Sequence, residues 1–412
     1  MKYGLIGEKL GHSFSREIHA CLSDYKYELR ELAREELSYF MTERDFLGIN
    51  VTIPYKEAVI PYLDFVDASA NKIGSVNTVV NRGGKLFGYN TDYLGMKALI
   101  EHRGISLLGR KVAILGTGGT SKTAHTVCES LSAREVITVS RRGGDGFITY
   151  EELYSSHTDT EVIINTTPVG MFPNSYAIPI DPLAFPSLTG VVDAVYNPQR
   201  TPLVRRAREL LINAAGGLYM LVAQAYFASE LFLDTKYPEG KIEEIYKNIR
   251  RKKENIVLTG MPASGKSTVG KILADALGRE LIDTDSMIAD TAGMPIPEIF
   301  EKYGEAHFRR LETEAIKSAS EKSGIIIATG GGAVLKAENI DALRSNGRIY
   351  FIDRPLESLI PTDDRPLSST REAIEARYKE RYPIYLATLD VHVDANTSPE
   401  SVAEKIIGEH EK

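Results

Sequence analysis

The sequence predicts an α/β fold throughout, divided among two or three domains. A chain of 412 residues exceeds what a single hydrophobic core usually fills. Residues 111–139 and 255–278 each show a short apolar strand, a glycine-rich turn and a stretch with the apolar spacing of a helix. The second segment has the pattern that opens a domain, so we expect a complete unit before residue 255.

Composition and charge argue against several classes of function. The formal net charge of −7 gives no support to a nucleic-acid role, which would favour a basic domain. Cys21 and Cys128 lack the spacing of metal ligands and suit a reducing cytosol. The N-terminus has no signal-peptide core, and the most apolar stretch, 218–233, is interrupted by Gln224 and Glu230. We therefore expect a soluble, cytoplasmic protein with no membrane and no nucleic-acid partner.

Short polar motifs follow predicted strands in the first hundred residues. Residues 2–7 form one predicted strand, and Ser13 and Ser15 stand two positions apart before a helical segment. Both hydroxyls could bind an anion such as a carboxylate, although taken alone an N-cap is the better explanation. Residues 49–53 alternate apolar and polar side chains, which predicts a strand with Lys56 just beyond its end, where α/β folds place ligand clefts.

Two further motifs carry isolated polar groups. GSVNTVV at 74–80 contains Asn77, and GYNTDYLG at 88–95 contains Asp92, each among apolar residues and glycines. Taken alone, Lys56 would be interpreted as a solvated surface lysine and Asp92 as a helix cap.

Together these motifs resemble shikimate dehydrogenase over about residues 1–250, because at least five separated motifs occur in the family's order. The resemblance implies that Lys56 and Asp92 are the catalytic pair. It implies substrate contacts by Ser13, Ser15, Thr52, Asn77, Asp92, Tyr196 and Gln224. Reducing a ketone requires a proton for the developing alkoxide, and a lysine held near a carboxylate can donate it. A ligand would also explain Gln224, because burying an unpaired amide on an apolar helix is costly.

One departure from the family lies in the segment SREIHA at 15–20, where the family more often has Ser-Pro and His-Asn.

The middle of the chain predicts a dinucleotide site. A strand at 111–115 leads into GTGGTSKTA at 116–124, where Ser121 stands in the place of the third glycine of G-x-G-x-x-G. A second strand at 135–139 completes the βαβ pattern. An NAD enzyme would show an acidic residue after that strand, whereas this chain has Arg141, which suits the 2′-phosphate of NADP. The alternative interpretation is that Arg141 and the neighbouring Arg142 simply belong to a solvated turn.

The same resemblance extends through NTTPVGM at 165–171 and DAVYNPQRTPL at 193–203. It implies NADP contacts by Gly116, Thr117, Gly118, Gly119, Thr120, Arg141, Thr166, Val195 and Gly217. The expected domains are a substrate domain at 1–100, completed by returning helices at 218–250, and a Rossmann-type NADP domain at 101–217.

A strongly charged segment at 236–254 follows. Ile242, Ile245 and Ile249 keep a helical spacing, which predicts a helix and then a short polar hinge. The basic run at its end is better explained as a solvated linker than as a nucleic-acid contact.

Residues 260–267, GMPASGKS, fit the phosphate-binding pattern G-x-x-x-x-G-K-[ST] without substitution. An apolar strand at 255–259 precedes the loop, and a helix follows it. Free N–H groups at a helix N-terminus bind phosphate, Lys266 adds a positive charge, and the Ser267 hydroxyl suits Mg²⁺. The pattern predicts a nucleotide site, and a glycine-rich turn that binds nothing is the weaker alternative.

Motifs after the phosphate loop predict residues that would bind the metal and the acceptor of the phosphoryl group. LIDTDSMI at 281–288 places Asp283 and Asp285 on one face of a predicted strand, so one could serve Mg²⁺ and the other orient an acceptor hydroxyl. A helical stretch with Arg309 and a glycine turn at 328–333 follow. Nothing in this part matches protein-kinase signatures.

These features resemble shikimate kinase over about residues 254–412, and they imply a P-loop kinase domain with a central parallel sheet at 255–412. The implied ATP contacts are Gly260, Ala263, Ser264, Gly265, Lys266, Ser267, Thr268 and Arg365. Ser267 and Asp283 would hold the metal, and Lys266 and Asp285 would take part in catalysis. The implied contacts to shikimate are Asp285, Arg309, Gly331 and Arg381. Guanidinium groups suit a carboxylate because they bind it through two hydrogen bonds. The lid before Arg365 is short and acidic compared with the family.

The resemblances together imply a bifunctional enzyme of aromatic biosynthesis that reduces 3-dehydroshikimate to shikimate with NADPH and then phosphorylates shikimate from ATP with Mg²⁺. Its partners would be these small molecules, and a homo-oligomer is possible. One alternative is a quinate-type dehydrogenase joined to another small-molecule kinase. A second is a ligand-sensing regulator built from inactive enzymes, against which the retention of Lys56, Asp92, Lys266 and Asp285 counts.

Overall fold

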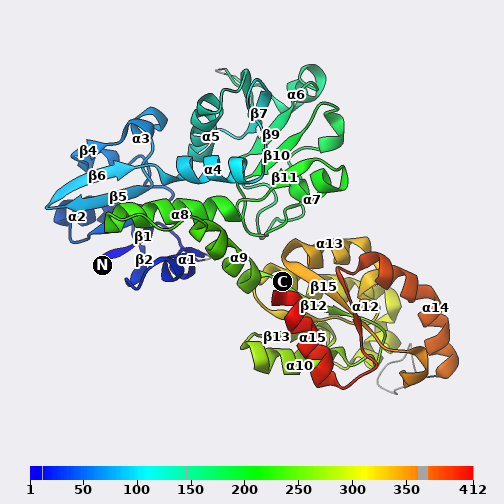
Figure 1. Ribbon diagram of the computed structural model, residues 1–412. Coiled ribbons are helices and arrows are strands. Elements are labelled where there is room, and N and C mark those ends of the chain that lie inside the picture. The colour runs from blue at the N-terminus through cyan, green and yellow to red at the C-terminus, as the bar shows by residue number, and fades with distance from the viewer. Residues whose placement is uncertain (12, 145, 361–369, 412) are drawn as a thin grey trace. The chain divides into compact units, whose positions relative to one another are not determined.

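The computed structural model describes residues 1–11, 13–144, 146–360 and 370–411 (Figure 1). The chain divides into two compact units, Met1–Ile249 and Arg250–Lys412. The first unit contains two sheets and the second contains one, and helices cover each of them. The predicted α/β fold is confirmed. The finer division of the first unit at residue 100 stays a prediction, and helix α4 (Thr91–His102) runs across it.

The first sheet of the first unit is mixed, with strand order β2-β1-β3-β5-β6-β4. Its strands are β1 (Tyr3–Gly7), β2 (Tyr27–Glu31), β3 (Gly48–Val51), β4 (Phe65–Val66), β5 (Thr78–Arg82) and β6 (Lys85–Tyr89). The segments around it are α1 (Ser15–Leu22), α2 (Glu36–Glu43), the 3-10 turn η1 (Ile60–Tyr62) and α3 (Ala68–Ile73). Strand β3 lies inside the sheet and all its residues are buried, including Asn50. The predicted apolar alternation stops there, because Ile53 lies beyond the strand and is 75% exposed.

The second sheet is parallel, with order β11-β10-β9-β7-β8. Its strands are β7 (Lys111–Leu115), β8 (Glu135–Val139), β9 (Val162–Asn165), β10 (Gly190–Asp193) and β11 (Asn213–Ala215). Its helices are α5 (Gly119–Ser130), α6 (Tyr150–Ser156), η2 (Pro182–Ala184) and α7 (Pro202–Glu209). The strand order reverses direction at β7, and α/β folds bind ligands at such a point, outside the carboxyl ends of the strands.

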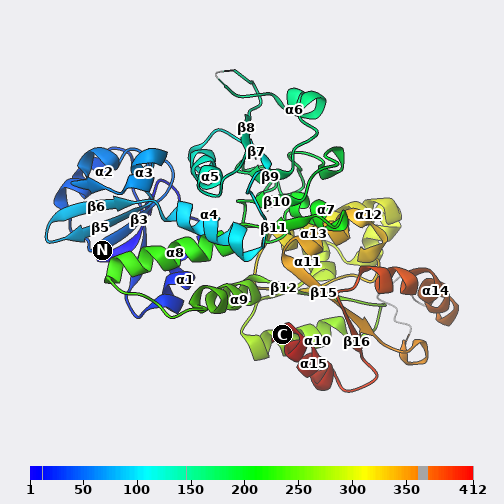
Figure 2. The ribbon, with the colours of Figure 1, turned by 45° about the horizontal axis from the view of Figure 1, so that its top comes forward.

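Helix α8 (Leu218–Leu233) returns the chain from the second sheet to the first sheet's domain. It lies side by side with α4 between the two sheets (Figures 1 and 2). Phe14, at the N-cap of α1, and Ile18 within that helix pack with Val222 of α8 and with Ile245 of α9 (Lys241–Lys253). This apolar packing brings residues near the N-terminus against residues from beyond position 217.

The sheet of the second unit is parallel, with order β13-β14-β12-β15-β16. Its strands are β12 (Asn255–Thr259), β13 (Leu281–Asp283), β14 (Ile326–Ala328), β15 (Gly347–Asp353) and β16 (Val391–Asp394). Helices α10 (Lys266–Leu277) and α15 (Pro399–Glu411) pack on one face. The other face carries α12 (Ile296–Glu321), α13 (Ala337–Asn346) and α14 (Arg371–Thr388). The remaining segments are α11 (Thr284–Ala292), η3 (Ala333–Leu335) and η4 (Leu356–Ser358).

The predicted charged helix corresponds to α9, which ends at Lys253, and β12 begins at Asn255; a hinge at this junction stays a prediction. One local expectation was wrong. Asp283 and Asp285 do not share a strand face, because β13 ends at Asp283, whose carboxylate caps helix α11. In the part of the chain that the structure describes, no helix is both long and apolar enough to span a membrane.

Candidate functional site

A cavity of about 320 Å³ in the first unit gathers the residues predicted to bind substrate. It lies where β1 and β3 end and where α4 and α8 begin. All eight predicted catalytic and substrate-binding residues of this unit line it: Ser13, Ser15, Thr52, Lys56, Asn77, Asp92, Tyr196 and Gln224. These residues come from segments as far apart as positions 13 and 224, so the fold itself assembles the group.

The charged pair of this cavity is Lys56 and Asp92. Lys56 Nζ donates to Asp92 Oδ2 at 2.6 Å, and both side chains are about one-fifth exposed, 23% and 18%. Asp92 lies in the first turn of α4, where the positive end of the helix dipole stabilises a carboxylate. A proton donor and a fixed negative charge therefore stand together at the wall of the cavity.

The paired serines lie at the N-terminus of α1. Ser13 Oγ donates to Ser15 Oγ at 2.9 Å and accepts from Ser15 N at 3.2 Å. The N-cap position belongs to Phe14, which makes no side-chain capping bond. Neither serine occupies the N-cap position, and both hydroxyls line the cavity.

Asn77 is held by the start of α4. Its Oδ1 accepts from Thr91 N at 2.7 Å and from Thr78 Oγ1 at 3.1 Å. Asn50, which sequence reasoning missed, supports the same group from β3. Asn50 Nδ2 donates to Thr78 Oγ1 at 3.0 Å, its Oδ1 accepts from Tyr27 OH at 2.7 Å, and it also lines the cavity. An amide between two buried apolar residues of a strand was the available signal.

Gln224 has a partner within its own helix. Its Nε2 donates to Leu221 O at 2.9 Å, and the residue is 8% exposed. Part of the cost of burying the amide is therefore met without a ligand, which weakens the argument that its burial requires one.

The glycine loop after β7 fits a dinucleotide phosphate. Gly116 has φ +107°, and a Cβ there would meet Thr166 Oγ1 at 2.8 Å. A Cβ added at Gly118 or Gly119 would meet no heavy atom within 4 Å, so the N-terminus of α5 opens onto free space. Free N–H groups at such an end bind phosphate.

The other predicted NADP residues surround this loop. Thr117 is exposed, Thr120 lines the cavity, and Thr166 Oγ1 donates to Leu115 O at 2.6 Å. A Cβ at Gly217 would lie 2.2 Å from Ala194 O, so packing alone requires that glycine.

Arg141 and Val195 complete the predicted set. Arg141 is exposed just after β8, at the start of a turn in which Ser140 Oγ accepts from Gly143 N at 3.0 Å. Val195 is buried, and its carbonyl accepts from Gly217 N at 2.9 Å. Arg141 can reach a ligand from this turn, whereas the side chain of Val195 acts in packing.

The phosphate loop of the second unit wraps around the Lys266 ammonium. Lys266 Nζ donates to Gly260 O at 2.9 Å, to Met261 O at 2.8 Å and to Ser264 Oγ at 3.4 Å. The loop needs left-handed backbone, with φ +94° at Gly265 and φ +62° at Ala263. Thr268 lies in the first turn of α10.

Ser267 and Asp283 meet beside this loop. Ser267 Oγ donates to Asp283 Oδ2 at 2.6 Å, while Asp283 Oδ1 accepts from Asp285 N at 3.0 Å. A hydroxyl and a carboxylate suit Mg²⁺, which usually takes one or two protein oxygens together with waters and phosphates. The donor set therefore fits the expected metal.

The glycine turn after β14 faces Asp285 and Arg309. A Cβ at Gly330 would lie 2.5 Å from Asp285 Oδ1, and a Cβ at Gly332 would lie 2.1 Å from Arg309 Nη1. Side chains on this turn would displace both groups. Between these glycines, Gly331 O accepts from Arg381 Nη1 at 3.0 Å.

Glu312 is a further site residue that sequence reasoning missed. Arg309 Nη1 donates to Glu312 Oε2 at 2.8 Å, and Glu312 is 1% exposed. Burial alone would lower the pKa of Arg309, but Glu312 and Glu305 raise it above its ordinary value. Burial lowers the pKa of Arg381. Among the described residues, Glu312 Oε1 and Arg381 Nε are buried without a hydrogen-bond partner, so the first could accept a hydrogen bond from a polar ligand and the second could donate one.

Tyr385 connects the two loops. Its hydroxyl lies 2.9 Å from Gly260 O and 2.6 Å from Gly331 O, and burial raises its pKa. The predicted ATP residue Arg365 lies outside the described residues.

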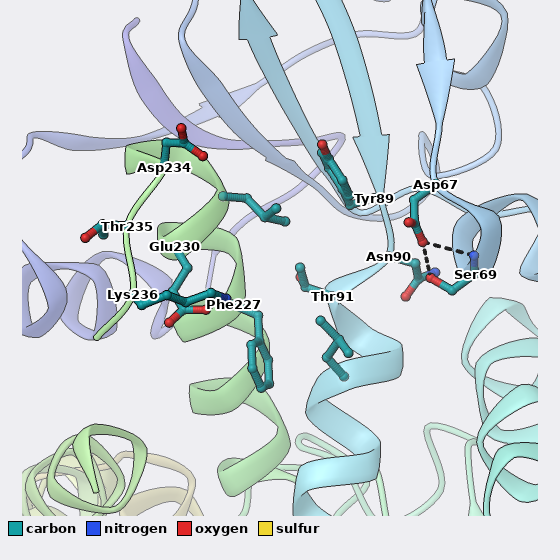
Figure 3. Close-up of a pocket in the computed structure, with 12 residues that line it drawn as sticks. Asp67, Ser69, Tyr89, Asn90, Thr91, Phe227, Glu230, Asp234, Thr235 and Lys236 are labelled. Atoms are coloured by element: carbon teal, nitrogen blue, oxygen red, sulfur yellow. Dashed lines mark hydrogen bonds and ion pairs between the residues drawn. The ribbon is translucent and has the colours of Figure 1, made fainter. Parts of the chain in front are cut away.

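A second cavity in the first unit, of about 540 Å³, contains none of the predicted site residues. Figure 3 shows Phe227 and Glu230 of α8 facing Tyr89 and Thr91 across it. Glu230 Oε2 accepts from Lys236 Nζ at 2.6 Å. The smaller cavity is therefore the candidate active site, because the residues predicted for catalysis line it and not the larger one.

Comparison with known proteins follows the same division. A family model described as the shikimate dehydrogenase substrate binding domain matches residues 5–79, and one described as shikimate kinase matches residues 262–411. A shikimate dehydrogenase (NADP(+)) from Clostridium beijerinckii is 36% identical over 267 residues, which cover 60% of this chain and 98% of the relative. One from Halothermothrix orenii is 38% identical over 273 residues, which cover 59% of this chain and 93% of the relative.

Solved structures of shikimate dehydrogenases also resemble the first unit. Shikimate dehydrogenase 1 from Peptoclostridium difficile has a TM-score of 0.56 at 34% identity and covers 60% of this chain and 98% of its own. The Thermus thermophilus enzyme in complex with NADP(H) and shikimate has a TM-score of 0.55 at 28% identity and covers 60% of this chain and 99% of its own.

Proposed function

Because the chain belongs to the shikimate dehydrogenase family over its N-terminal 60% and carries a shikimate kinase domain after it, we propose that it catalyses two consecutive reactions. The dehydrogenase unit, Met1–Ile249, reduces 3-dehydroshikimate to shikimate with NADPH. The kinase unit, Arg250–Lys412, phosphorylates shikimate from ATP and yields shikimate 3-phosphate. Both reactions act on the oxygen at C3, first as a ketone and then as the attacking hydroxyl.

One observation above all supports the proposed reduction: a single cavity is lined by Lys56, Asp92 and the paired serines. The cofactor supplies a hydride to C3. The Lys56 ammonium gives its proton to the developing alkoxide, and Asp92 holds that ammonium in place. The hydroxyls of Ser13 and Ser15 provide donors for the substrate carboxylate.

The open N-terminus of α5 supports NADPH as the reductant. The space in front of Gly118 and Gly119 accommodates a pyrophosphate. Arg141 after β8 favours the 2′-phosphate of NADPH over the free hydroxyl of NADH. The NADP-dependent relatives and the relative in complex with NADP(H) agree with this assignment.

The geometry of the kinase unit supports phosphoryl transfer to the same acid. Lys266 would neutralise the outer phosphates, and Ser267 with Asp283 would hold Mg²⁺. Asp285 would orient the acceptor hydroxyl, while Arg309 and Arg381 would bind the carboxylate. Their placement around one glycine turn is the observation that supports this acceptor.

The purified chain tests both assignments in one assay. 3-Dehydroshikimate and NADPH are supplied first and the absorbance of NADPH is followed, after which ATP and Mg²⁺ are added and shikimate 3-phosphate is sought by mass spectrometry. Absence of NADPH oxidation would refute the first assignment, and reduction without a phosphorylated product would refute the second. Faster turnover of quinate with NADP⁺ would favour the quinate-type alternative, and binding without turnover would favour a sensor.

A further inference from the structure

An ion pair joins the loop of the catalytic lysine to the helix of the dinucleotide loop. Lys122 Nζ donates to Glu57 Oε1 at 2.7 Å. Glu57 directly follows Lys56, and Lys122 lies in the first turn of α5, whose N-cap is Gly118. The pair therefore connects the segment that would supply the proton to the segment that would hold the cofactor.

The placement of Lys122 has no explanation within its own helix. A positive charge in the first turn opposes the helix dipole, which favours acidic residues there. Glu57 supplies the missing negative charge from another part of the fold. The two side chains are 48% and 62% exposed, and ion pairs that exposed contribute little to stability. The pair is therefore of interest for the two segments that it joins and not for its contribution to stability.

A second ion pair fixes the other end of the same helix. Lys72 Nζ of α3 lies 2.5 Å from Glu129 Oε2 in the last turn of α5. Glu129 follows Lys122 by seven positions, or about two helical turns, so both project from one face of α5. The two pairs have opposite polarity, so only one orientation of α5 satisfies both.

We propose that Glu57 and Lys122 form a positioning pair for the reduction, which holds the glycine loop at the start of α5 in register with Lys56. Neither residue lines the 320 Å³ cavity, whereas their neighbours Lys56 and Thr120 do. The pair acts through these neighbours and contacts neither reactant. The inference rests on the proposed dehydrogenase activity.

Charge reversal tests the pair in the full-length chain. Glu57→Lys and Lys122→Glu each place like charges together, and we expect each to lower kcat for 3-dehydroshikimate reduction about fivefold or more, because small displacements of reacting groups are costly. The double variant restores an opposite-charge pair and should recover kcat to within about twofold of the wild type. Lys26→Glu is the matched control, since it places like charges together at an exposed pair of the same unit that does not involve α5, Lys26 Nζ and Glu28 Oε1 at 3.2 Å, and it should leave kcat within about twofold.

Two readouts separate positioning from other roles. The urea unfolding transition of the dehydrogenase unit reports whether each variant is folded, and calorimetry with NADP⁺ reports cofactor binding without turnover. NADP⁺ affinity should fall in each single reversal and return in the double variant. The inference would be overturned if the two single variants had the kcat and NADP⁺ affinity of the wild type. It would also be overturned if the loss of kcat in the double variant equalled the product of the losses in the two single variants. If the wild type binds NADP⁺ but does not reduce 3-dehydroshikimate, the proposed function alone is refuted. The NADP⁺ affinities of the wild type, the two single variants and the double variant would still test the pair.

Discussion

The Lys56 ammonium and the Asp92 carboxylate meet at 2.6 Å although 36 positions separate them in the chain. Lys56 follows strand β3, and Asp92 stands in the first turn of α4. Asp92 therefore keeps its place at the positive end of the helix dipole if the lysine is removed. This geometry allows the role of Lys56 to be tested without disrupting the fold.

Replacing Lys56 with Met should abolish the reduction selectively. The variant keeps the length and apolar stem of the side chain but has no proton to give, so kcat for 3-dehydroshikimate should fall by about 10²–10⁴-fold. NADPH oxidation in the steady state measures this. Phosphorylation of shikimate should stay at the wild-type rate, because Lys56 belongs to the other compact unit.

Lys266→Met is the reciprocal control. The variant loses the ammonium that the phosphate loop surrounds, so phosphoryl transfer should fall by about 10²-fold or more while the reduction persists. Loss of both activities from either variant would contradict independent units.

Arg141 should determine the preference between NADPH and NADH. A charged hydrogen bond to the 2′-phosphate is worth about 1.5–3 kcal/mol, so Arg141→Ala should lower the ratio of kcat/KM for NADPH to that for NADH by about 10–100-fold. Arg142→Ala removes the same charge from the adjacent position and is the matched control. If both variants change the ratio equally, the effect is general electrostatics rather than recognition by Arg141.

Removing Arg309 should destabilise the kinase unit because its partner Glu312 is buried. Arg309→Ala leaves a carboxylate with 1% exposure without its guanidinium, and breaking a buried pair in this way costs about 3–5 kcal/mol. The kinase transition in urea unfolding measures the loss.

The double variant Arg309→Leu with Glu312→Leu is the control, because replacing both members by apolar groups costs much less. Equal destabilisation by the single and double variants would show that packing rather than the unpaired charge dominates. Both variants should fail to bind shikimate.

His19 should make the dehydrogenase unit sensitive to acid. Burial lowers the pKa of His19 from 6.5 to about 3, so the unfolded chain takes up a proton below pH 6.5 that the folded chain refuses. The stabilisation is complete above pH 6.5 and is lost as the pH falls towards 3, by at most about 1.4 kcal/mol per pH unit. The loss of unfolding free energy between pH 6.5 and pH 5, measured by urea unfolding, should be about 1.6 kcal/mol smaller in His19→Gln than in the wild type.

Another buried group in the same unit shifts in the opposite sense. Burial raises the pKa of Asp193 to about 6, so its contribution favours the folded state as the pH falls. Asp193 is common to both proteins and cancels in the comparison. Equal pH dependence in the wild type and His19→Gln would remove His19 as the cause.

The sequence was sufficient for those parts of the fold that depend on local pattern. Predicted strands at 111–115, 135–139 and 255–259 match β7, β8 and β12, because buried parallel strands are short apolar runs. The eight residues assigned to one cavity by family resemblance do line one cavity.

Long-range partners could not be predicted in this way. The burial of Glu312 depends on packing of α12, the role of Asn50 depends on its neighbours Tyr27 and Thr78, and the contact between Glu57 and Lys122 spans 65 positions. The error at Asp285 had a local cause, since the capping carboxylate of Asp283 ends the strand and begins a helix.

The hydroxyl of Tyr385 has one proton and two carbonyl oxygens within reach, Gly260 O and Gly331 O. Lys266 and Arg381 are the second donors to these oxygens. If ATP draws Lys266 away and shikimate draws Arg381 away, both carbonyls compete for the same proton, which makes joint occupancy less favourable by about 1 kcal/mol. Negative cooperativity between the two ligands would follow. Titrations of shikimate with and without a non-hydrolysable ATP analogue should show it in the wild type and lose it in Tyr385→Phe.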